Sequence, residues 1–239
     1  MKLIYLEEVD STNLYAKKHI DEIEDKTIVY TFNQTAGRGR MERKWSYMGD
    51  GNIYASIVLK PSKELKEVYS NLTQYLCVVL VETFENFGII PQIKWPNDIR
   101  VNKKKISGIL AEAVVDGGAL KGLIIGFGVN LNCKKDDLEK INQPATSLNL
   151  ELGFEINKEK FLKKVLEKFC LRYDSFIEKG FLLIREEYIR RVEFLNQPVT
   201  VKVFDKEIQG IAKDITETGA IKLVDNNNKE HTLLIGDIL

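Results

Sequence analysis

The sequence predicts an α+β protein with a mixed, largely antiparallel sheet and a small β-barrel at the C-terminus. Strand-like and helix-like segments alternate early in the chain, and hairpin turns join the strands in its middle. After residues 196–198 only short alternating strands follow. We therefore place a large domain at residues 1–191 and a small barrel domain at residues 192–239.

The first part of the chain is predicted to pair strands with two helices. Residues 10–13 are rich in helix-capping side chains and precede an amphipathic stretch that reaches Ile20, so a helix is expected there. The segment from Gln34 to Gly51 is too long and polar for a simple hairpin, and long loops of this kind are often functional. β-Branched, aromatic and apolar runs predict strands at 2–6, 27–32 and 52–59, and a helix at 65–87.

The rest of the chain is predicted to contain a meander, a helical region and the barrel. A strand is expected at 89–95 and a turn at 96–98. An antiparallel meander of strands at 99–101, 104–115 and 120–129 should follow, with Asp116, Gly117 and Gly118 as its hairpin turn. Helix returns at 158–191, with interruptions. The barrel strands are expected at 199–204, 208–215, 220–224 and 231–235.

Composition excludes several classes of protein. The 35 Lys and Arg residues are balanced by 35 Asp and Glu residues, and 44% of the chain is hydrophobic, which argues against disorder and against a dedicated DNA or RNA binder. No apolar run approaches the ~18 residues of a membrane span, and the N-terminus turns acidic too early for a signal peptide. The three cysteines and two histidines show no ligand spacing, so we expect a cytoplasmic protein without a metal site.

Three segments concentrate residues suited to chemistry. In residues 34–45, glycines alternate with Arg38 and Arg40, so the backbone can approach a ligand while guanidinium groups face carboxylate or phosphate oxygens. A solvated basic loop is the alternative, and neither a Walker A loop nor a dinucleotide fingerprint is present. In the second segment, residues 94–98 form a turn and Lys105 projects from an apolar strand. In the third, residues 126–132, two amides either bind a ligand or close a turn.

Taken together and in this order, the segments resemble the biotin protein ligases. The resemblance also covers residues 10–13 and 145–148 and extends into the C-terminal domain. It implies the class II synthetase-like catalytic fold of biotin and lipoate ligases, followed by an SH3-like barrel. It also implies a ligase that uses ATP, with Mg²⁺, to activate biotin as biotinyl-5′-AMP. The biotinyl group then passes to a lysine of the biotin carboxyl carrier domain of a carboxylase such as acetyl-CoA carboxylase.

The resemblance assigns roles to individual residues. It implies cations around the reacting anions and a carboxylate that orients the incoming lysine, and it matches these catalytic positions to Arg38, Arg40, Lys105 and Asp98. Ureido-binding positions match Ser11, Thr12 and Gln34, of which the first two also suit a helix cap. The remaining binding positions for biotin or the adenylate match Asn13, Gly39, Trp45, Asn97, Gly108, Asn130 and Asn132.

The chain departs from the family pattern at two places. Glu42 stands where the family usually has glycine, which puts the closed form of the loop in doubt. The capping block begins ten residues from the N-terminus, which leaves no room for a winged-helix DNA-binding domain, so a short form without DNA binding is expected. A homodimer is one outcome the resemblance leaves open. The alternatives are a lipoate protein ligase, disfavoured by Gln34, and a non-catalytic biotin-binding regulatory module, disfavoured by the intact cations.

Overall fold

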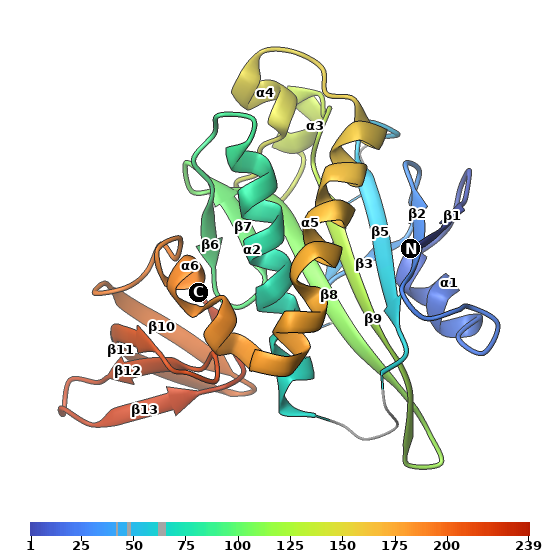
Figure 1. The fold of residues 1–239 in the computed structure, drawn as a ribbon. Helices are drawn as coiled ribbons and strands as arrows, with labels where there is room; N and C mark the ends of the chain where they lie inside the picture. Colours follow the sequence, from blue (N-terminus) through green and yellow to red (C-terminus); the bar gives the residue numbers. More distant parts are fainter. Residues whose placement is uncertain (42, 47–48, 62–65) are drawn as a thin grey trace. The chain divides into compact units, whose positions relative to one another are not determined.

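The computed structural model describes residues 1–41, 43–46, 49–61 and 66–239 (Figure 1). The chain divides into two compact units. One unit contains Met1–Lys66 and Val101–Lys164, and the other contains Glu67–Arg100 and Val165–Leu239. Each unit has strands and buried apolar residues of its own. The arginine loop is the segment of residues 34–45 that contains Arg38 and Arg40. Its unusual residue, Glu42, lies outside the described residues.

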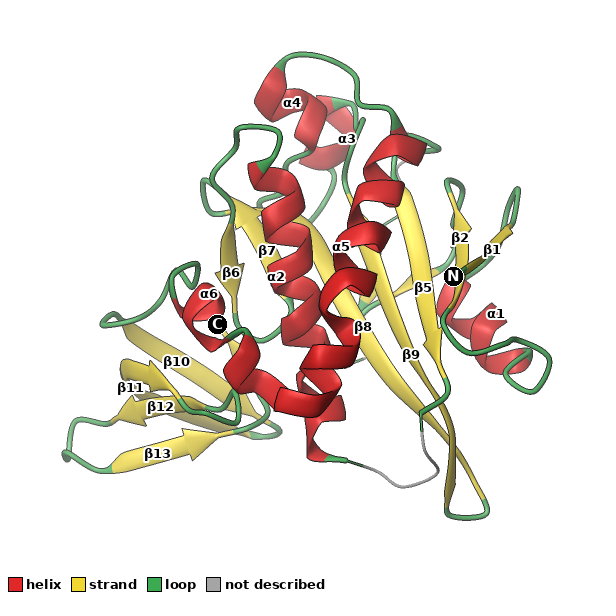
Figure 2. Ribbon diagram, in the orientation of Figure 1, coloured by secondary structure: helices red, strands yellow, loops and turns green. Residues whose placement is uncertain are grey.

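Five strands of the first unit form a mixed sheet. Its order is β1 (Lys2–Tyr5), β2 (Thr27–Thr31), β5 (Ile53–Leu59), β9 (Ala119–Val129) and β8 (Lys104–Asp116). The first two strands are parallel, and every other neighbouring pair is antiparallel. Strand β5 is buried along its whole length, as its continuous apolar run requires. The predicted α+β class with a largely antiparallel sheet is therefore confirmed (Figure 2).

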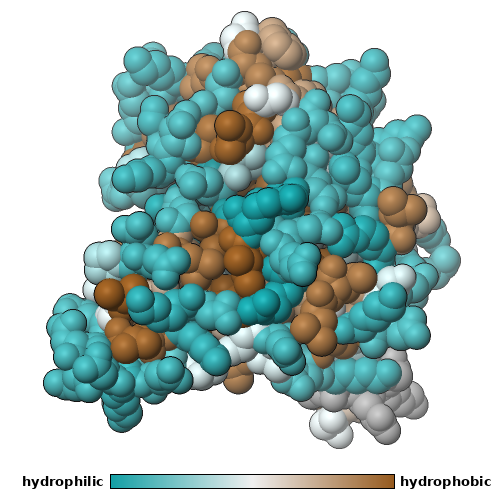
Figure 3. Space-filling view, turned by 60° about the vertical axis from the view of Figure 1, so that its left-hand side comes forward, coloured by the Kyte–Doolittle hydropathy of each residue, from teal (hydrophilic) through white to brown (hydrophobic). Residues whose placement is uncertain are grey.

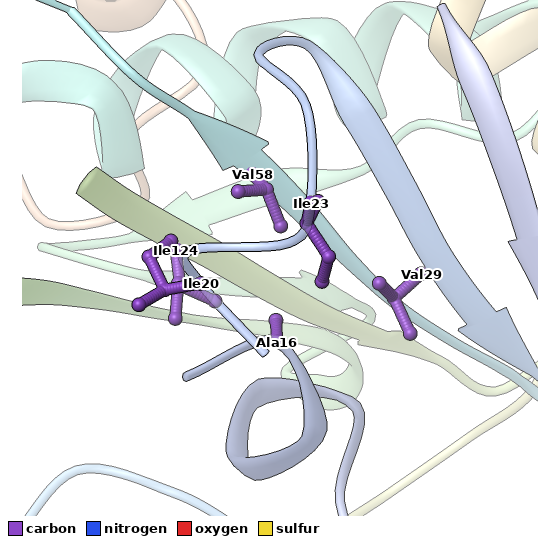
Figure 4. Packing of buried hydrophobic residues seen from close by; sticks show 6 residues of the cluster. All are labelled: Ala16, Ile20, Ile23, Val29, Val58 and Ile124. Atoms are coloured by element: carbon purple, nitrogen blue, oxygen red, sulfur yellow. The ribbon is translucent and has the colours of Figure 1, made fainter. Parts of the chain in front are cut away.

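One face of this sheet is covered by helix α1 (Thr12–Lys18), which packs on β2, β5 and β9. The contact is apolar, because side chains of the helix and of the segment that follows it lie against valine and isoleucine side chains of the strands (Figure 4). The cluster consists of Ala16, Ile20, Ile23, Val29, Val58 and Ile124. Its members are at most 6% exposed. Burial of their apolar surface therefore stabilises the position of the helix on the sheet.

The remaining elements of the first unit are short. A two-stranded hairpin within the predicted functional loop consists of β3 (Gly37–Arg38) and β4 (Lys44–Trp45). Two helices of five residues each, α3 (Lys135–Glu139) and α4 (Leu148–Leu152), follow strand β9. Neither helix was predicted, because one turn of helix carries too little periodicity to be recognised.

The second unit combines helices with a two-stranded hairpin and a five-stranded sheet. A 3₁₀ turn, η1 (Glu67–Asn71), leads into α2 (Leu72–Glu85), and β6 (Gln92–Lys94) and β7 (Asp98–Val101) form a hairpin. The helix α5 (Lys158–Lys179) begins in the first unit and continues in the second, before η2 (Gly180–Leu183) and α6 (Arg185–Ile189). Strand β6 is shorter than predicted, since Pro91 lacks the N–H group that would extend the ladder.

The C-terminal strands form a five-stranded antiparallel sheet, which Figure 2 shows in yellow. Its order is β13 (Glu230–Leu233), β12 (Ile221–Val224), β11 (Lys206–Ile215), β10 (Pro198–Val203) and β14 (Asp237–Ile238). Four of the five strands were predicted. Within the part of the chain that the structure describes, the end strands β13 and β14 do not pair with each other, so the predicted barrel is not closed.

On the face shown in Figure 3, hydrophobic residues form separate patches between hydrophilic ones. None of the helices built from the described residues combines the length and the apolar character that a membrane crossing requires.

Candidate functional site

The predicted site residues of the first unit lie around one face of its sheet. In the register of the antiparallel strands, Ser56 on β5 lies opposite Gly126 on β9, which lies opposite Leu110 on β8. Residues directly opposite each other point to the same face, and so do residues two apart along a strand. Gly108 and Gly128, which are also paired, therefore share this face with Ser56.

Asn13 packs directly onto the backbone of this face. A Cβ added at Gly126 would lie 2.7 Å from the Cγ and 2.9 Å from the Nδ2 of Asn13, both too close for real atoms. Only glycine lets the first turn of α1 come this near to β9. The Asn13 amide donates to the Leu110 carbonyl at 3.2 Å and to the Glu112 carboxylate at 2.8 Å, and its oxygen accepts from the Ser56 hydroxyl at 2.6 Å. All of its hydrogen-bonding capacity but one lone pair is thus used.

Gln34 is held beside α1 by the backbone. A parallel bridge joins Val9 to Gln34, and the Thr35 N–H donates to the Val9 carbonyl at 3.0 Å. Gln34 Oε1 then accepts from the Thr12 N–H at 2.9 Å, with the Thr12 hydroxyl 3.3 Å away. Because the oxygen faces the helix, the NH₂ group of the amide points elsewhere and is available as a donor.

Ser11 begins the helix. Its side chain accepts from the Leu14 N–H at 3.4 Å and it is 2% exposed. The capping interpretation of this residue therefore agrees with the geometry.

Trp45 lies against the paired glycines. A Cβ at Gly108 would be 2.8 Å from the indole ring, and a Cβ at Gly128 would be 2.7 Å from it. The Lys105 ammonium is 5.3 Å from the centroid of the same ring, within the range of a cation–π contact. Gly108, expected to make room for a ligand, therefore makes room for Trp45 and Lys105 in this structure.

The arginine loop meets the sheet at Glu112. In the β3–β4 hairpin Gly37 is opposite Trp45 and Arg38 is opposite Lys44. Arg38 Nη1 is 3.6 Å from Glu112 Oε1, which makes an ion pair across the edge of the site. Next to it, the Gly39 N–H donates to the Arg43 carbonyl at 2.7 Å, and the Arg43 N–H donates to the Arg40 carbonyl at 3.1 Å, so backbone hydrogen bonds hold both Gly39 and Arg40.

The two asparagines after β9 have different environments. Asn132 exchanges two hydrogen bonds of 2.8 Å with the backbone of Ile156, so its amide closes a loop before α5. Asn130 is 2% exposed and donates to the Thr146 carbonyl at 3.0 Å. Among the described buried polar atoms without a hydrogen-bond partner are Asn130 Oδ1 and Trp45 Nε1, one acceptor and one donor. Such atoms are costly to leave unpaired, so both are candidates for contact with a ligand.

Asn97 and Asp98 belong to the second unit, with the hairpin β6–β7. Asp98 is directly opposite Lys94, and burial lowers the pKa of that lysine, with a further contribution from Arg100. The turn follows Trp95, which is 2% exposed and donates from Nε1 to the Gly219 carbonyl at 3.4 Å.

The same carbonyl anchors the C-terminal sheet. It accepts from Gln74 Nε2 at 2.8 Å, and Asn71 Nδ2 donates to the Thr218 carbonyl at 2.9 Å. The turn before β12 is therefore fixed to the start of α2 within the second unit.

Sequence reasoning missed Ser56 and Glu112. Each is a polar residue within a run of mostly apolar strand residues, in the segments Ile53–Leu59 and Lys104–Asp116. That contrast was the available signal, since a polar group in a buried strand needs a partner. The described residues contain no group of three or more His, Cys, Asp or Glu side chains arranged to hold a metal ion.

Family models and curated relatives both relate the chain to biotin protein ligases. The family model described as "Biotin/lipoate A/B protein ligase family" matches residues 5–130, and that of the "Biotin protein ligase C terminal domain" matches residues 194–239. The chain is 30% identical to the biotin--[acetyl-CoA-carboxylase] ligase of Paracoccus denitrificans, over 91% of this chain and 92% of that protein.

Two further relatives bear on the fold and the length. The bifunctional ligase/repressor BirA of Bacillus spizizenii is 35% identical over 77% of this chain, which spans 57% of that protein. A solved structure of biotin protein ligase from Aquifex aeolicus in complex with biotin and ATP is 28% identical, with a TM-score of 0.86, covering 100% of this chain and 97% of that one. The fold is therefore that of biotin protein ligases.

Proposed function

Because the chain belongs to the biotin/lipoate A/B protein ligase family, we propose that it is an ATP-dependent biotin protein ligase. It joins biotin to AMP with release of pyrophosphate, and then transfers the biotinyl group to a lysine of a biotin carboxyl carrier domain. The observation that carries this proposal is the buried polar cluster of Thr12, Gln34 and Ser56 beside the cations Arg38 and Lys105.

The polar cluster suits the ureido ring of biotin. The Gln34 NH₂ group is a donor for the ureido oxygen, because the Thr12 N–H already holds the amide oxygen. Ser11 supplies a hydroxyl at the same end of the site. Lipoate has a wholly apolar dithiolane ring, which would bury these groups without partners, so the cluster favours biotin over lipoate.

The cations suit the first reaction. Attack of the biotin carboxylate on the α-phosphate of ATP brings two anions together, so positive groups must offset their repulsion. Arg38, Arg40 and Lys105 fill this role in the proposal. Trp45 supplies an apolar wall and its unpaired N–H, and Asn130 its unpaired oxygen, on the adenylate side of the site. Mg²⁺ enters with the phosphates of ATP, as part of the substrate.

The second reaction needs a group that orients the attacking lysine amine. We assign this role to Asp98, with Asn97 beside it on the same turn. The extensive hydrogen bonding around Trp95 and Gly219 supports a fixed position for this turn within its own unit. Asn13, Gly39, Gly108 and Asn132 act by shaping the site, which their backbone approaches and hydrogen bonds support.

We further propose a catalytic domain at residues 1–191 and a C-terminal domain at 192–239, supported by the family match at 194–239. We expect no DNA binding by residues 1–239, because their basic and acidic residues are equal in number. A homodimer and a cytoplasmic location stay predictions, the first tested by light scattering.

The decisive experiment measures biotin-dependent exchange of labelled pyrophosphate into ATP, with biotin and lipoate in competition. We expect exchange with biotin and none with lipoate. Exchange with lipoate alone would identify a lipoate ligase, and binding of biotin without exchange would identify a non-catalytic module. Transfer is then followed by the mass increase of a purified biotin carboxyl carrier domain, which a Lys→Arg change at its acceptor position should abolish.

A further inference from the structure

We propose that Glu112 is a positioning residue for Arg38 in adenylate formation. A chain of buried side chains connects it to the amide of Gln34 at the other end of the site. This role rests on the proposed function, because adenylate formation is the reaction in which its effect is measured.

The two oxygens of Glu112 have different partners. Oε2 accepts from the Asn13 amide at 2.8 Å, and Oε1 is 3.6 Å from Arg38 Nη1. The Glu112 side chain is 21% exposed and the Arg38 side chain 45%. The carboxylate is therefore fixed on one side by a buried amide, and on the other side it attracts a guanidinium group that water still reaches.

Glu112 and the Leu110 carbonyl, as acceptors, set the direction of the hydrogen bonds of Asn13. Because the Asn13 NH₂ group donates to Glu112 and to the Leu110 carbonyl, its oxygen must accept, and the donor is the Ser56 hydroxyl at 2.6 Å. The Ser56 hydroxyl has only one proton, and this bond to Asn13 uses it. The Thr12 hydroxyl, 2.8 Å from the Ser56 oxygen and 3.3 Å from the Gln34 amide oxygen, is the next group of the chain.

The chain ends at the ligand side of the site, where the Thr12 N–H holds the amide oxygen of Gln34 at 2.9 Å. Thr12, Asn13, Gln34 and Ser56 are each at most 7% exposed, so water does not compete for these bonds. The amide that meets the ureido group and the guanidinium that meets the phosphate thus share one connected network.

Arg38 depends on this network for its place. It lies in a strand of only two residues, paired with a second strand of equal length. A hairpin of this size is marginal by itself, so side-chain contacts decide where its cation lies. The Glu112→Gln substitution distinguishes the hydrogen bond to Asn13 from the ion pair with Arg38. The amide oxygen of glutamine still accepts from Asn13, but the uncharged side chain no longer forms an ion pair with the guanidinium group.

The test is a double-mutant cycle in the pyrophosphate exchange assay. We expect Glu112→Gln to lower kcat about tenfold and to change the KM for biotin less than about twofold. In the Arg38→Ala background the same substitution should lower kcat less than about twofold, because the residue it positions is absent. A purely structural role would not depend on Arg38.

Glu24→Gln is the matched control. It also removes one carboxylate paired with a cation, the Lys2–Glu24 pair at 2.9 Å, but at an exposed site of the same unit. It should leave kcat unchanged.

Equal losses from Glu112→Gln with and without Arg38 would overturn the positioning role. Should that variant not fold, as judged by circular dichroism, Glu112→Asp carries the same test. It keeps the charge but draws it back by one methylene group, so its smaller loss must also vanish in the Arg38→Ala background, and a loss that persists there overturns the role. Absence of exchange in the parent protein refutes the proposed function instead, which keeps the two failures distinct.

Discussion

Replacing Gly126 by alanine tests whether the site is assembled by the close approach of α1 to β9. The new Cβ would meet the Asn13 side chain at 2.7 Å from Cγ and 2.9 Å from Nδ2, and Asn13 is enclosed by the sheet. The asparagine must therefore move, and it cannot keep its bonds to Ser56, Leu110 and Glu112.

The cost follows from those three bonds. Two are to neutral groups, at roughly 1 kcal/mol each, and the one to the carboxylate contributes about 2 kcal/mol. The free energy of unfolding should therefore fall by about 4 kcal/mol, a large share of the ~5–15 kcal/mol of a typical domain. For a chain of this length that corresponds to a Tm lower by roughly 8–16 °C.

The assay is thermal and urea unfolding, with amide hydrogen exchange across α1 and β9 to report on this unit by itself. Gly117→Ala is the control, since its φ of 56° strains alanine but no atom lies within 4 Å of the added Cβ. It should cost only about 1 kcal/mol. If Gly126→Ala costs no more than this control, or costs as much in an Asn13→Ala background as in the parent, the close-packing account is refuted.

Three further predictions concern other parts of the chain. Burial and the Glu187 carboxylate raise the pKa of Glu82 from 4.5 to about 7, so the folded state binds a proton that the unfolded state lacks, and stability falls as the pH rises from 4.5 to 7. Glu82→Gln should flatten this fall by roughly 1–3 kcal/mol in urea unfolding at pH 5 and 7.5, and an unchanged slope would contradict it. Gln74→Leu removes the 2.8 Å bond to the Gly219 carbonyl and should cost roughly 1–3 kcal/mol, with faster amide exchange in the turn before β12; unaltered exchange would argue against the anchor. Arg40→Ala should still bind biotin but release the adenylate at least about tenfold faster in gel filtration, whereas retention equal to the parent's would remove its assigned role.

The sequence was sufficient for elements whose signal is local. The run at residues 53–59 is buried throughout, and the Asp116 to Gly118 turn joins β8 to β9 as expected. Elements too short to show a hydrophobic pattern were not predicted, as with the five-residue helix α3 and the two-residue strand β14. One turn of helix or one bridge carries no periodicity, and only packing within the folded unit stabilises it.

The site was predictable as a set of residue types but not as a network. Arg38 and Lys105 stood out as cations from chemistry alone, whereas Gln34 was assigned to ureido binding only through the family resemblance. The bonds of Asn13 to Ser56 and Glu112 join residues 43 and 99 positions apart. No local pattern encodes such a pairing, because it depends on strand register and on where the helix lies on the sheet.

The alternate glycines of β9 show how the two kinds of information combine. Their spacing places Gly126 and Gly128 on one face, and a glycine within a strand suggests that something approaches closely. The approaching groups are Asn13 from α1 and the Trp45 ring from the arginine loop. Two small residues on one strand thus fix both the helix that holds Gln34 and the loop that holds Arg38. Since Gln34 and Arg38 are then held, through these neighbours, against the same strand, the proposed ureido and phosphate contacts would be set at a fixed separation, as joining the two ends of one substrate requires.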